Sequence, residues 1–104
     1  MSGGPARWRV HRDVAWVSRE DLDPGEAPTA YATRLPRGRP MALEGSACLV
    51  WLALADLSED AGGGTVSEVA AAAAAMADVS ADDVVEDVGA LISLLVDAGL
   101  VDAS

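Results

Sequence analysis

The sequence predicts an α+β fold with a winged-helix-like order of elements, in which a three-stranded antiparallel sheet is followed by three helices. The first observation is that the N-terminal half alternates apolar and polar residues between turns rich in proline and glycine, as strands do. The second is that residues 80–100 repeat their apolar positions with the period of an α-helix, after two shorter helical stretches.

The first strand is predicted near the N-terminus. Alternating apolar residues in WRVHRDVAWVS indicate one or two half-buried strand segments, of which Asp13–Ser18 is the firmer. Residues 1–12 are expected to form a flexible tail with a possible first strand segment, and residues 13–104 a single domain. The acidic stretch 19–28 has a Pro-Gly turn and no periodicity, so it is interpreted as a solvated loop.

Residues 29–35 and 39–43 are predicted to form a hairpin around a tight turn that carries two arginines. Proline has no backbone N–H to donate to a neighbouring strand. Pro40 therefore indicates that strand 39–43 lies at the edge of the sheet, where its backbone groups lack a partner on one side. Such an edge needs either a covering element or a binding partner.

Two helices are predicted next. The first starts at residue 45 or 46, ends near residue 56 and is apolar on nearly all sides, which indicates burial. A glycine-rich connector, 57–64, is expected to be flexible and leads to the second helix. That helix begins at the capping box Thr65–Glu68 and continues through an alanine run, whose small side chains are expected to allow a close approach of its neighbours.

The third helix is expected to run from about Ala81 to about Ala98, between a capping box at Ser80 and a stop at Gly99. Its core stripe consists of Val84, Val88, Leu91 and Leu95, with Val85, Ile92 and Val96 beside it. Leu94 lies outside this stripe, on a flank that also holds Asp83, Asp87 and Ala90. The helix therefore carries more apolar surface than one core needs.

The charge distribution disfavours nucleic acid as a partner. The formal net charge is −10, all seven basic residues precede residue 40, and residues 55–104 hold eleven acids and no base. A duplex-binding domain needs a basic face that neutralises phosphates, and the acidic helical half would repel DNA instead. A winged-helix transcription factor is an alternative function, but it would require a basic recognition helix, and this sequence has none.

Several other classes of site are also disfavoured. Cys48 stands in the apolar run CLVWLALA and is interpreted as a buried free thiol, and one Cys with one His cannot assemble a zinc site. No nucleophile–base pair and no phosphate-binding loop is present, so neither catalysis nor a cofactor is expected. No segment is apolar enough to span a membrane or to act as a signal peptide, which makes the cytoplasm the expected location.

A diffuse pattern of apolar positions, caps and turns over residues 13–101 resembles the PqqD-like family. The resemblance is carried by Leu43-Glu44-Gly45-Ser46-Ala47, Val50-Trp51, Thr65-Val66-Ser67-Glu68-Val69, Glu86-Asp87-Val88, Leu91-Ile92, Leu95 and Gly99-Leu100-Val101. One departure is Glu44, which stands where the family usually has Asn, so that Glu44 or Ser46 is expected to cap the first helix differently.

The resemblance implies a non-catalytic domain that recognises the leader of a ribosomally made, post-translationally modified peptide. The leader would add as a strand to residues 39–43 and pack its side chains on helix 81–98, and a separate enzyme would then modify the precursor. The peptide-binding residues expected on these two walls are Arg39, Met41, Ala42, Leu43, Asp87, Ala90, Leu91 and Leu94.

Three points stay open at the level of sequence. Either the flank with Asp87 and Leu94 or the flank with Val85, Ile92 and Val96 faces the edge strand. Asp87 could pair with a basic leader residue or, internally, with Arg37 or Arg39. The edge strand and Leu94 could instead meet a second copy in a structural dimerisation module, so monomer and homodimer are both compatible with the sequence.

Overall fold

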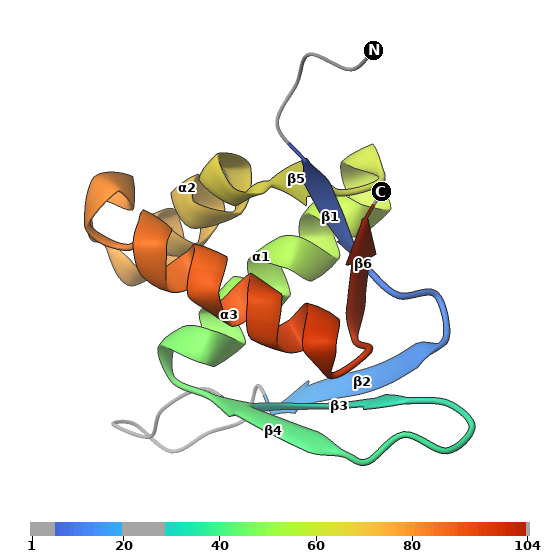
Figure 1. Ribbon diagram of the computed structural model, residues 1–104. Helices are drawn as coiled ribbons and strands as arrows, with labels where there is room; N and C mark the ends of the chain where they lie inside the picture. The colour runs from blue at the N-terminus through green and yellow to red at the C-terminus, as the bar shows by residue number, and fades with distance from the viewer. Residues whose placement is uncertain (1–5, 20–28, 104) are drawn as a thin grey trace, which may run out of the picture.

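The computed structural model describes residues 6–19 and 29–103 of the chain, and over these residues the protein has an α+β fold. Three α-helices and two three-stranded antiparallel sheets make up this part of the chain (Figure 1). The α+β class predicted from the sequence is confirmed. The order of elements differs from the prediction because strands also stand before the predicted sheet, between the first two helices and after the last helix.

The predicted three-stranded sheet is present as β2 (Val14–Arg19), β3 (Thr29–Arg34) and β4 (Met41–Glu44). The strands lie in the order β2-β3-β4, and both pairings are antiparallel. β4 is therefore an edge strand, as Pro40 indicated, although it begins at Met41 and not at residue 39. The loop predicted over residues 19–28 lies almost wholly outside the described residues.

The second sheet was not predicted, although a first strand segment was expected within residues 1–12. It consists of β5 (Gly64–Thr65), β1 (Arg7–Val10) and β6 (Val101–Ala103), with β1 in the centre. Arg7 pairs with Thr65 on one side, and Trp8 pairs with Ala103 on the other. Part of the predicted tail is thus an ordered strand that joins the two ends of the described chain.

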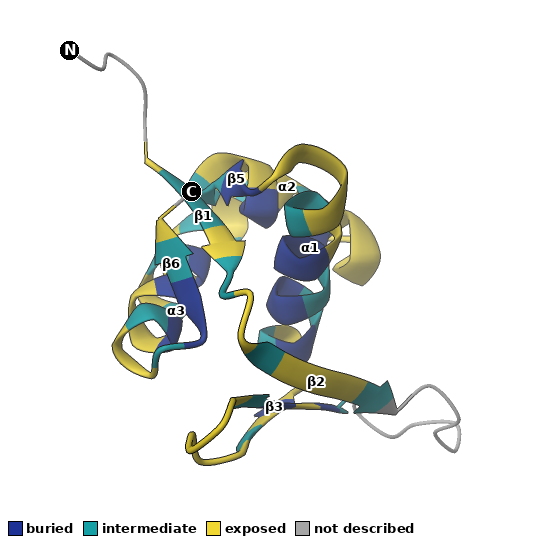
Figure 2. Ribbon diagram, turned by 90° about the vertical axis from the view of Figure 1, so that its right-hand side faces the viewer, coloured by how far each residue is buried: buried dark blue, intermediate teal, exposed yellow. Residues whose placement is uncertain are grey.

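Helix α1 (Ser46–Ala61) lies at the centre of the fold and contacts both sheets and α2. Trp51 and Leu54 have no exposed surface, and Cys48 is buried as predicted. The two alanines of β3 that point inward, Ala30 and Ala32, are buried as well. These small side chains let the bulky residues of α1 pack close to the sheet. Figure 2 shows buried positions on both α1 and β3.

The predicted C-terminal end of α1 was wrong, because the helix continues to Ala61 instead of ending near residue 56. Ser58 holds the additional turn against β1. Its hydroxyl accepts the backbone N–H of Val10 at 2.9 Å and donates to the carbonyl of Leu54 at 2.7 Å. The stretch 57–61, interpreted as a connector from its polarity, is therefore kept helical by a tertiary contact.

The first turn of α1 has no side-chain cap, so the expected cap by Glu44 or Ser46 was wrong. Gly45 occupies the N-cap position with a φ of 61°, and its carbonyl accepts the backbone N–H of Leu49 at 3.2 Å. A residue with a Cβ rarely adopts this positive φ, so glycine suits the sharp turn from β4 into α1. The turn brings the end of β4 and the start of α1 together.

Helix α2 (Val66–Ala77) begins at the predicted capping box. The Thr65 hydroxyl accepts the backbone N–H of Glu68 at 3.1 Å, and the Glu68 carboxylate accepts the backbone N–H of Thr65 at 2.9 Å. Arg7 of β1 donates to the same carboxylate at 3.1 Å. The cap therefore ties α2 to β1 as well as satisfying the first turn of the helix.

The carboxylate of Glu68 should make this cap depend on pH. Its pKa lies below the ordinary value, first because it accepts the Thr65 backbone N–H and then because Arg7 lies beside it. A lowered folded-state pKa means that the cap stabilises the fold above the ordinary carboxyl pKa and loses this effect as the pH falls through the folded-state value.

Glu68→Gln is therefore expected to lower the melting temperature at about pH 7, and the gap to the parent protein should narrow towards about pH 3. Thermal unfolding followed by circular dichroism across this range measures the gap. Glu59→Gln, an equal charge change at an exposed site on α1, is the matched control. A gap for Glu68→Gln that stays constant with pH would contradict the prediction.

Helix α3 (Val85–Asp97) begins four residues later than predicted, because residues Ala81–Asp83 form a 3-10 turn, η1, and the Ser80 side chain caps neither element. The predicted stop at Gly99 is confirmed. Gly99 has a φ of 80°, and its N–H bonds the carbonyl of Val96 at 3.0 Å. The N–H of Leu100 bonds the carbonyl of Leu95, also at 3.0 Å, which completes a Schellman motif.

The buried face of α3 is centred differently from the predicted stripe. Val88, Ile92 and Leu95 are buried, whereas Val84 and Leu91 are only partly buried. The stripe prediction was right for Val88 and Leu95. Ile92, which was predicted beside the stripe, is instead at the centre of the buried face. Leu91 is consequently only half-buried, although it still packs against the core.

Candidate functional site

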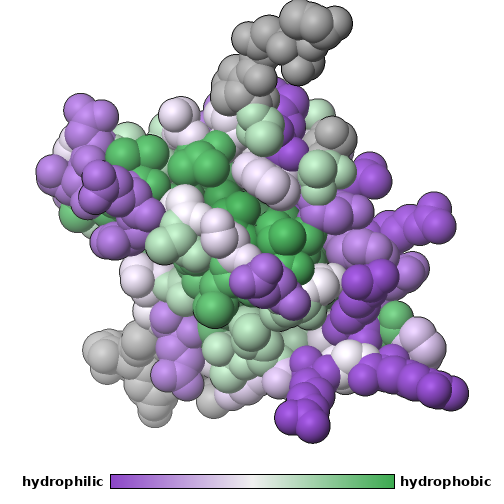
Figure 3. Space-filling model, viewed as in Figure 1, coloured by the Kyte–Doolittle hydropathy of each residue, from purple (hydrophilic) through white to green (hydrophobic). Residues whose placement is uncertain are grey.

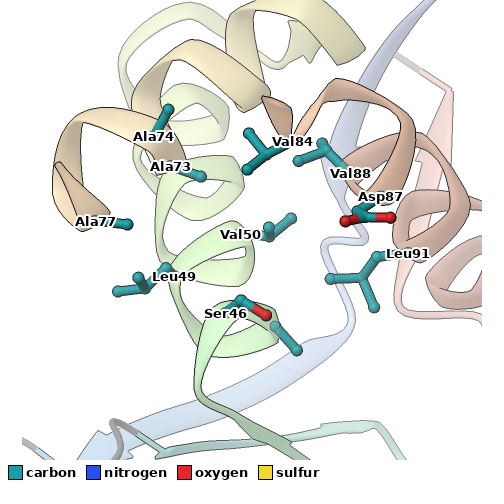
Figure 4. A pocket seen from close by; sticks show the side chains of 11 residues that line it. Ser46, Leu49, Val50, Ala73, Ala74, Ala77, Val84, Asp87, Val88 and Leu91 are labelled. Atoms are coloured by element: carbon teal, nitrogen blue, oxygen red, sulfur yellow. The ribbon is translucent and has the colours of Figure 1, made fainter. Parts of the chain in front are cut away.

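An apolar cavity of about 230 Å³ lies where α1, α2 and the start of α3 meet. Ser46 and Asp87 are its only polar side chains, and Asp87 lies beside Leu91 on the α3 wall (Figure 4). The residues that line the cavity are Ser46, Ala47, Leu49, Val50, Ala73, Ala74, Ala77, Val84, Asp87, Val88 and Leu91. A cavity of this kind suits an apolar side chain with a polar group at its margin.

The alanine run of α2 explains why the cavity exists. Ala73, Ala74 and Ala77 supply only methyl groups to its wall, opposite Val50 of α1 and Val84 before α3 (Figure 4). The helix packs against both neighbours, as its small side chains predicted, but these methyl groups do not fill the space between them. The alanines thus allow α2 to approach its neighbouring helices closely and also leave a cavity between them.

One edge of β4 stands open beside this cavity. β4 pairs with β3 alone, so within the described ranges its other edge has no strand partner. Leu43 is buried and contributes to the core, Met41 is half-buried, and Ala42 is exposed. Arg39 precedes the strand, so its backbone is not part of the strand pairing, and it can contribute to the edge only through its side chain.

Helix α3 runs alongside β4 in the opposite direction. A second hollow of about 380 Å³ is lined by Arg39, Pro40 and Met41 together with Ala98 and Leu100, which places the start of β4 beside the end of α3. At the other end, Ser46 lies across the first cavity from Asp87 and Leu91. We call the surface between the open edge of β4 and α3, which these two hollows bound, the groove. Figure 1 shows the ribbon of α3 above that of β4.

These contacts decide which flank of α3 faces the groove. Asp87, Leu91 and Ala98 all line hollows shared with β4 or the start of α1, and Leu94 follows the same three-to-four-residue spacing. On the other flank, Ile92 is buried, and Val85 and Val96 are packed against the core. The flank with Asp87 and Leu94 is the one turned towards the groove.

The predicted site residues on this flank differ in exposure. Leu91 is half-buried, whereas Asp87 and Ala90 are exposed, and Leu91 and Asp87 line the cavity. Leu94 is 55% exposed, so no described element covers it. Figure 3 shows the apolar surface that gathers over α2 and α3, with hydrophilic side chains at its borders. An apolar surface of this kind, next to an open strand edge, is suited to a partner.

The charged residues of the groove are not paired within the described part of the chain. The ion pairs found there join Arg7 to Glu68, Arg9 to Asp102 and His11 to Asp13. Asp87, Arg37 and Arg39 take part in none of them, so the internal pairing of Asp87 with either arginine does not form. These three charges are available to a ligand.

Sequence reasoning did not identify the wall of the cavity that α1 and α2 supply. The first helix was expected to be largely buried and the α2 alanines to allow a close approach, because nothing local distinguishes a methyl group facing a hollow from one facing a neighbour. The only available signal was the contrast between an alanine run and the larger apolar residues of the helices that flank it.

The described residues hold no group of three His, Cys, Asp or Glu side chains placed to bind a metal ion. None of the helices in residues 6–19 and 29–103 is long and apolar enough to cross a bilayer.

Fold and site together define a small α+β domain with a groove between an edge strand and a helix. The chain belongs to the family described as Coenzyme PQQ synthesis protein D (PqqD), which matches residues 22–101, more than half of its length. This is the family of recognition elements for ribosomally made, modified peptides, whose members bind precursor peptides and partner enzymes.

The resemblance read from the sequence is thus confirmed at the level of the family. The match begins within the segment between β2 and β3, so it includes β4, all three helices and the groove but leaves out β1 and β2. Searches of curated proteins and of solved structures found no match.

Proposed function

We propose that this protein binds the leader segment of a ribosomally made precursor peptide and presents it to a separate modifying enzyme, without catalysing the modification itself. The observation that carries the proposal is the unpaired edge of β4 beside the apolar cavity and the exposed flank of α3. Membership of the PqqD family supports the same role, because its members are accessory peptide-recognition elements.

In this proposal the leader adds as a fourth strand to β2-β3-β4. Its main chain pairs with the free backbone groups of Met41–Glu44, which gives affinity with little dependence on sequence. Side chains of a strand alternate between its two faces, so every second leader residue meets Leu91, Leu94 or the cavity. These side chains give the specificity.

The same proposal extends the sequence prediction in three respects. β2–β4 with the three helices would form the winged-helix-like unit, to which β1, β5 and β6 are additions. Binding would require no metal or cofactor. The protein would act in the cytoplasm on a newly made precursor.

A titration with synthetic leaders of the short precursors encoded beside the gene tests the proposal. We expect amide resonances of Met41–Glu44 and of α3 to shift, while those of the C-terminal part of α1 stay in place. Leaders methylated at single backbone nitrogens give a sharper test. Because alternate N–H groups of an added strand point to its neighbour, methylation should abolish binding at every second position and be tolerated between them.

Two results would contradict this prediction. Leaders that leave both β4 and α3 unshifted would exclude the proposed function for those precursors. Methylation effects without a two-residue period would exclude strand addition as the binding mode.

A dimerisation module is the second candidate, because the same open edge and the 55% exposed Leu94 could be covered by another copy of the chain. Light scattering over a range of protein concentrations separates the two. A mass that stays monomeric at high concentration favours the peptide-binding role, and a dimer dissociated by leader peptide would show that both use one surface.

A further inference from the structure

The groove between β4 and α3 ends in two hollows, and each is lined by one charged residue of opposite sign. Asp87 is the only charged residue in the cavity shared with Ser46 and Leu91. Arg39 is the only charged residue in the hollow shared with Met41 and Leu100. The two ends of the strand edge are thus chemically different, although both hollows are otherwise mostly apolar.

Neighbouring charges strengthen this difference at the Asp87 end. Glu44 closes β4 there, and Asp83 and Glu86 stand close to Asp87 along the chain. No lysine or arginine follows Arg39 in the sequence, so none of the later elements offsets these carboxylates. The uncapped start of α1 does oppose them, but a helix N-terminus is equivalent to only about half a unit charge.

The Arg39 end has the opposite balance. Arg34 and Arg37 line a hollow at the tip of the same hairpin, where they meet Asp13 and Asp97. With Arg39, three guanidinium groups therefore face two carboxylates, and neither Arg37 nor Arg39 forms an ion pair within the described ranges. A negative group on a ligand is favoured at this end and disfavoured at the other.

We infer that the groove selects peptides by the order of their charges, with a basic residue N-terminal to an apolar anchor and an acidic residue C-terminal to it. This inference rests on the proposed function and adds the chemistry of the ligand. Both existing pairings of the sheet are antiparallel, and an antiparallel ladder is slightly the more stable kind. A peptide antiparallel to β4 has its N-terminal side at Asp87 and its C-terminal side at Arg39.

The length of the edge sets the spacing between the two charges. Residues 39–44 span five steps of an extended chain, which at about 3.3 Å a step is roughly 17 Å. A bound strand covers this length with a similar number of residues. The basic and acidic positions of the ligand are therefore separated by about five residues, with the apolar anchor near the basic one.

A display library of random dodecapeptides tests the charge order without knowledge of the natural leader. We expect the enriched peptides to share a basic residue, an apolar anchor and then an acidic residue in this order. A synthetic enriched peptide should bind about tenfold more tightly than its copy with the two charges exchanged, and the preference should shrink at high salt.

Exchanging the protein charges gives the reciprocal test. The double variant Arg39→Glu with Asp87→Lys keeps the net charge and should prefer the charge-exchanged peptide. The matched control is Arg12→Glu with Glu59→Lys, which makes the same exchange at exposed residues outside the groove and should keep the parent preference. Circular dichroism of both variants verifies that they are folded.

Equal affinity for the two peptides, the opposite order among enriched peptides, or an unchanged preference in the groove variant would each overturn the charge-order inference. If library peptides still shift the resonances of β4 in any of these cases, the proposed function stands without the charge-order inference. If neither the library nor the encoded leaders yield a ligand that shifts β4, both the inference and the proposed function fail.

Discussion

Replacing Ala73 by leucine is expected to weaken leader binding at least tenfold without lowering the melting temperature. Ala73 is 6% exposed and its methyl group forms part of the cavity wall, opposite Val50 and Val84. Leucine adds three carbon atoms to a space of about 230 Å³, so the new side chain would occupy the place of the ligand's apolar anchor. Excluding one buried aliphatic side chain costs about 1.5–3 kcal/mol, which is tenfold or more in affinity.

Ala71→Leu is the matched control, because it makes the same change on an exposed position of α2. Isothermal titration with the leader gives the affinities, and thermal unfolding shows whether the parent fold is kept. Unchanged affinity in a folded Ala73→Leu variant would show that the cavity does not take part in binding. A fall in melting temperature would instead show that the cavity cannot accept the larger side chain.

The largest effect on stability is expected for Trp51→Ala. The Trp51 side chain has no exposed surface, and its ring meets that of Trp16 edge to face, with 6.0 Å between the ring centroids and an angle of 83° between the planes. Truncating a buried tryptophan costs about 3–5 kcal/mol. Because folded domains are stable by only about 5–15 kcal/mol, we expect a large loss in the unfolding free energy measured in urea.

Trp51→Phe separates the ring from its polar atom. The indole Nε1 of Trp51 is buried and has no hydrogen-bond partner among the described residues, so phenylalanine removes an unsatisfied donor while keeping most of the ring contacts. Its cost should therefore be clearly smaller than that of Trp51→Ala. Equal losses for the two substitutions would mean that the indole nitrogen stabilises the fold after all.

Local signals allowed much of the fold to be predicted. The capping box Thr65–Glu68, the stop at Gly99 and the edge position after Pro40 each follow from one or two residues acting on their own backbone. These features were confirmed because no distant contact is needed to produce them.

Features that depend on distant contacts were missed. A first strand segment was expected within residues 1–12, but its pairing with β5 and β6 was missed, because these two strands have only two and three residues and lie far from β1 in the sequence. The last turn of α1 was likewise missed because Ser58 is held by a backbone N–H of β1. The start of the third helix was placed too early because a suitable cap residue, Ser80, makes no cap bond.

The candidate site divides in the same way. Helical periodicity placed Asp87 on a flank beside the core stripe, whereas it placed Leu91 on the stripe itself, and Leu91 was expected on the groove only through the family resemblance. The opposite wall was not expected, because it depends on how far α2 stands from α1 and α3, a distance that no single segment encodes. Sequence therefore indicated one wall of the cavity and left the other to the assembled structure.

The pairing of β1 with β6 also bears on how such a domain can be tethered. It brings both ends of the described chain to one side of the molecule, opposite the side where β4 lies (Figure 1). An enzyme joined by a short flexible linker to either end would share the domain at an effective concentration of the order of millimolar, with the groove left clear. The position of the two ends is thus compatible both with a separate partner enzyme and with an enzyme fused to the domain.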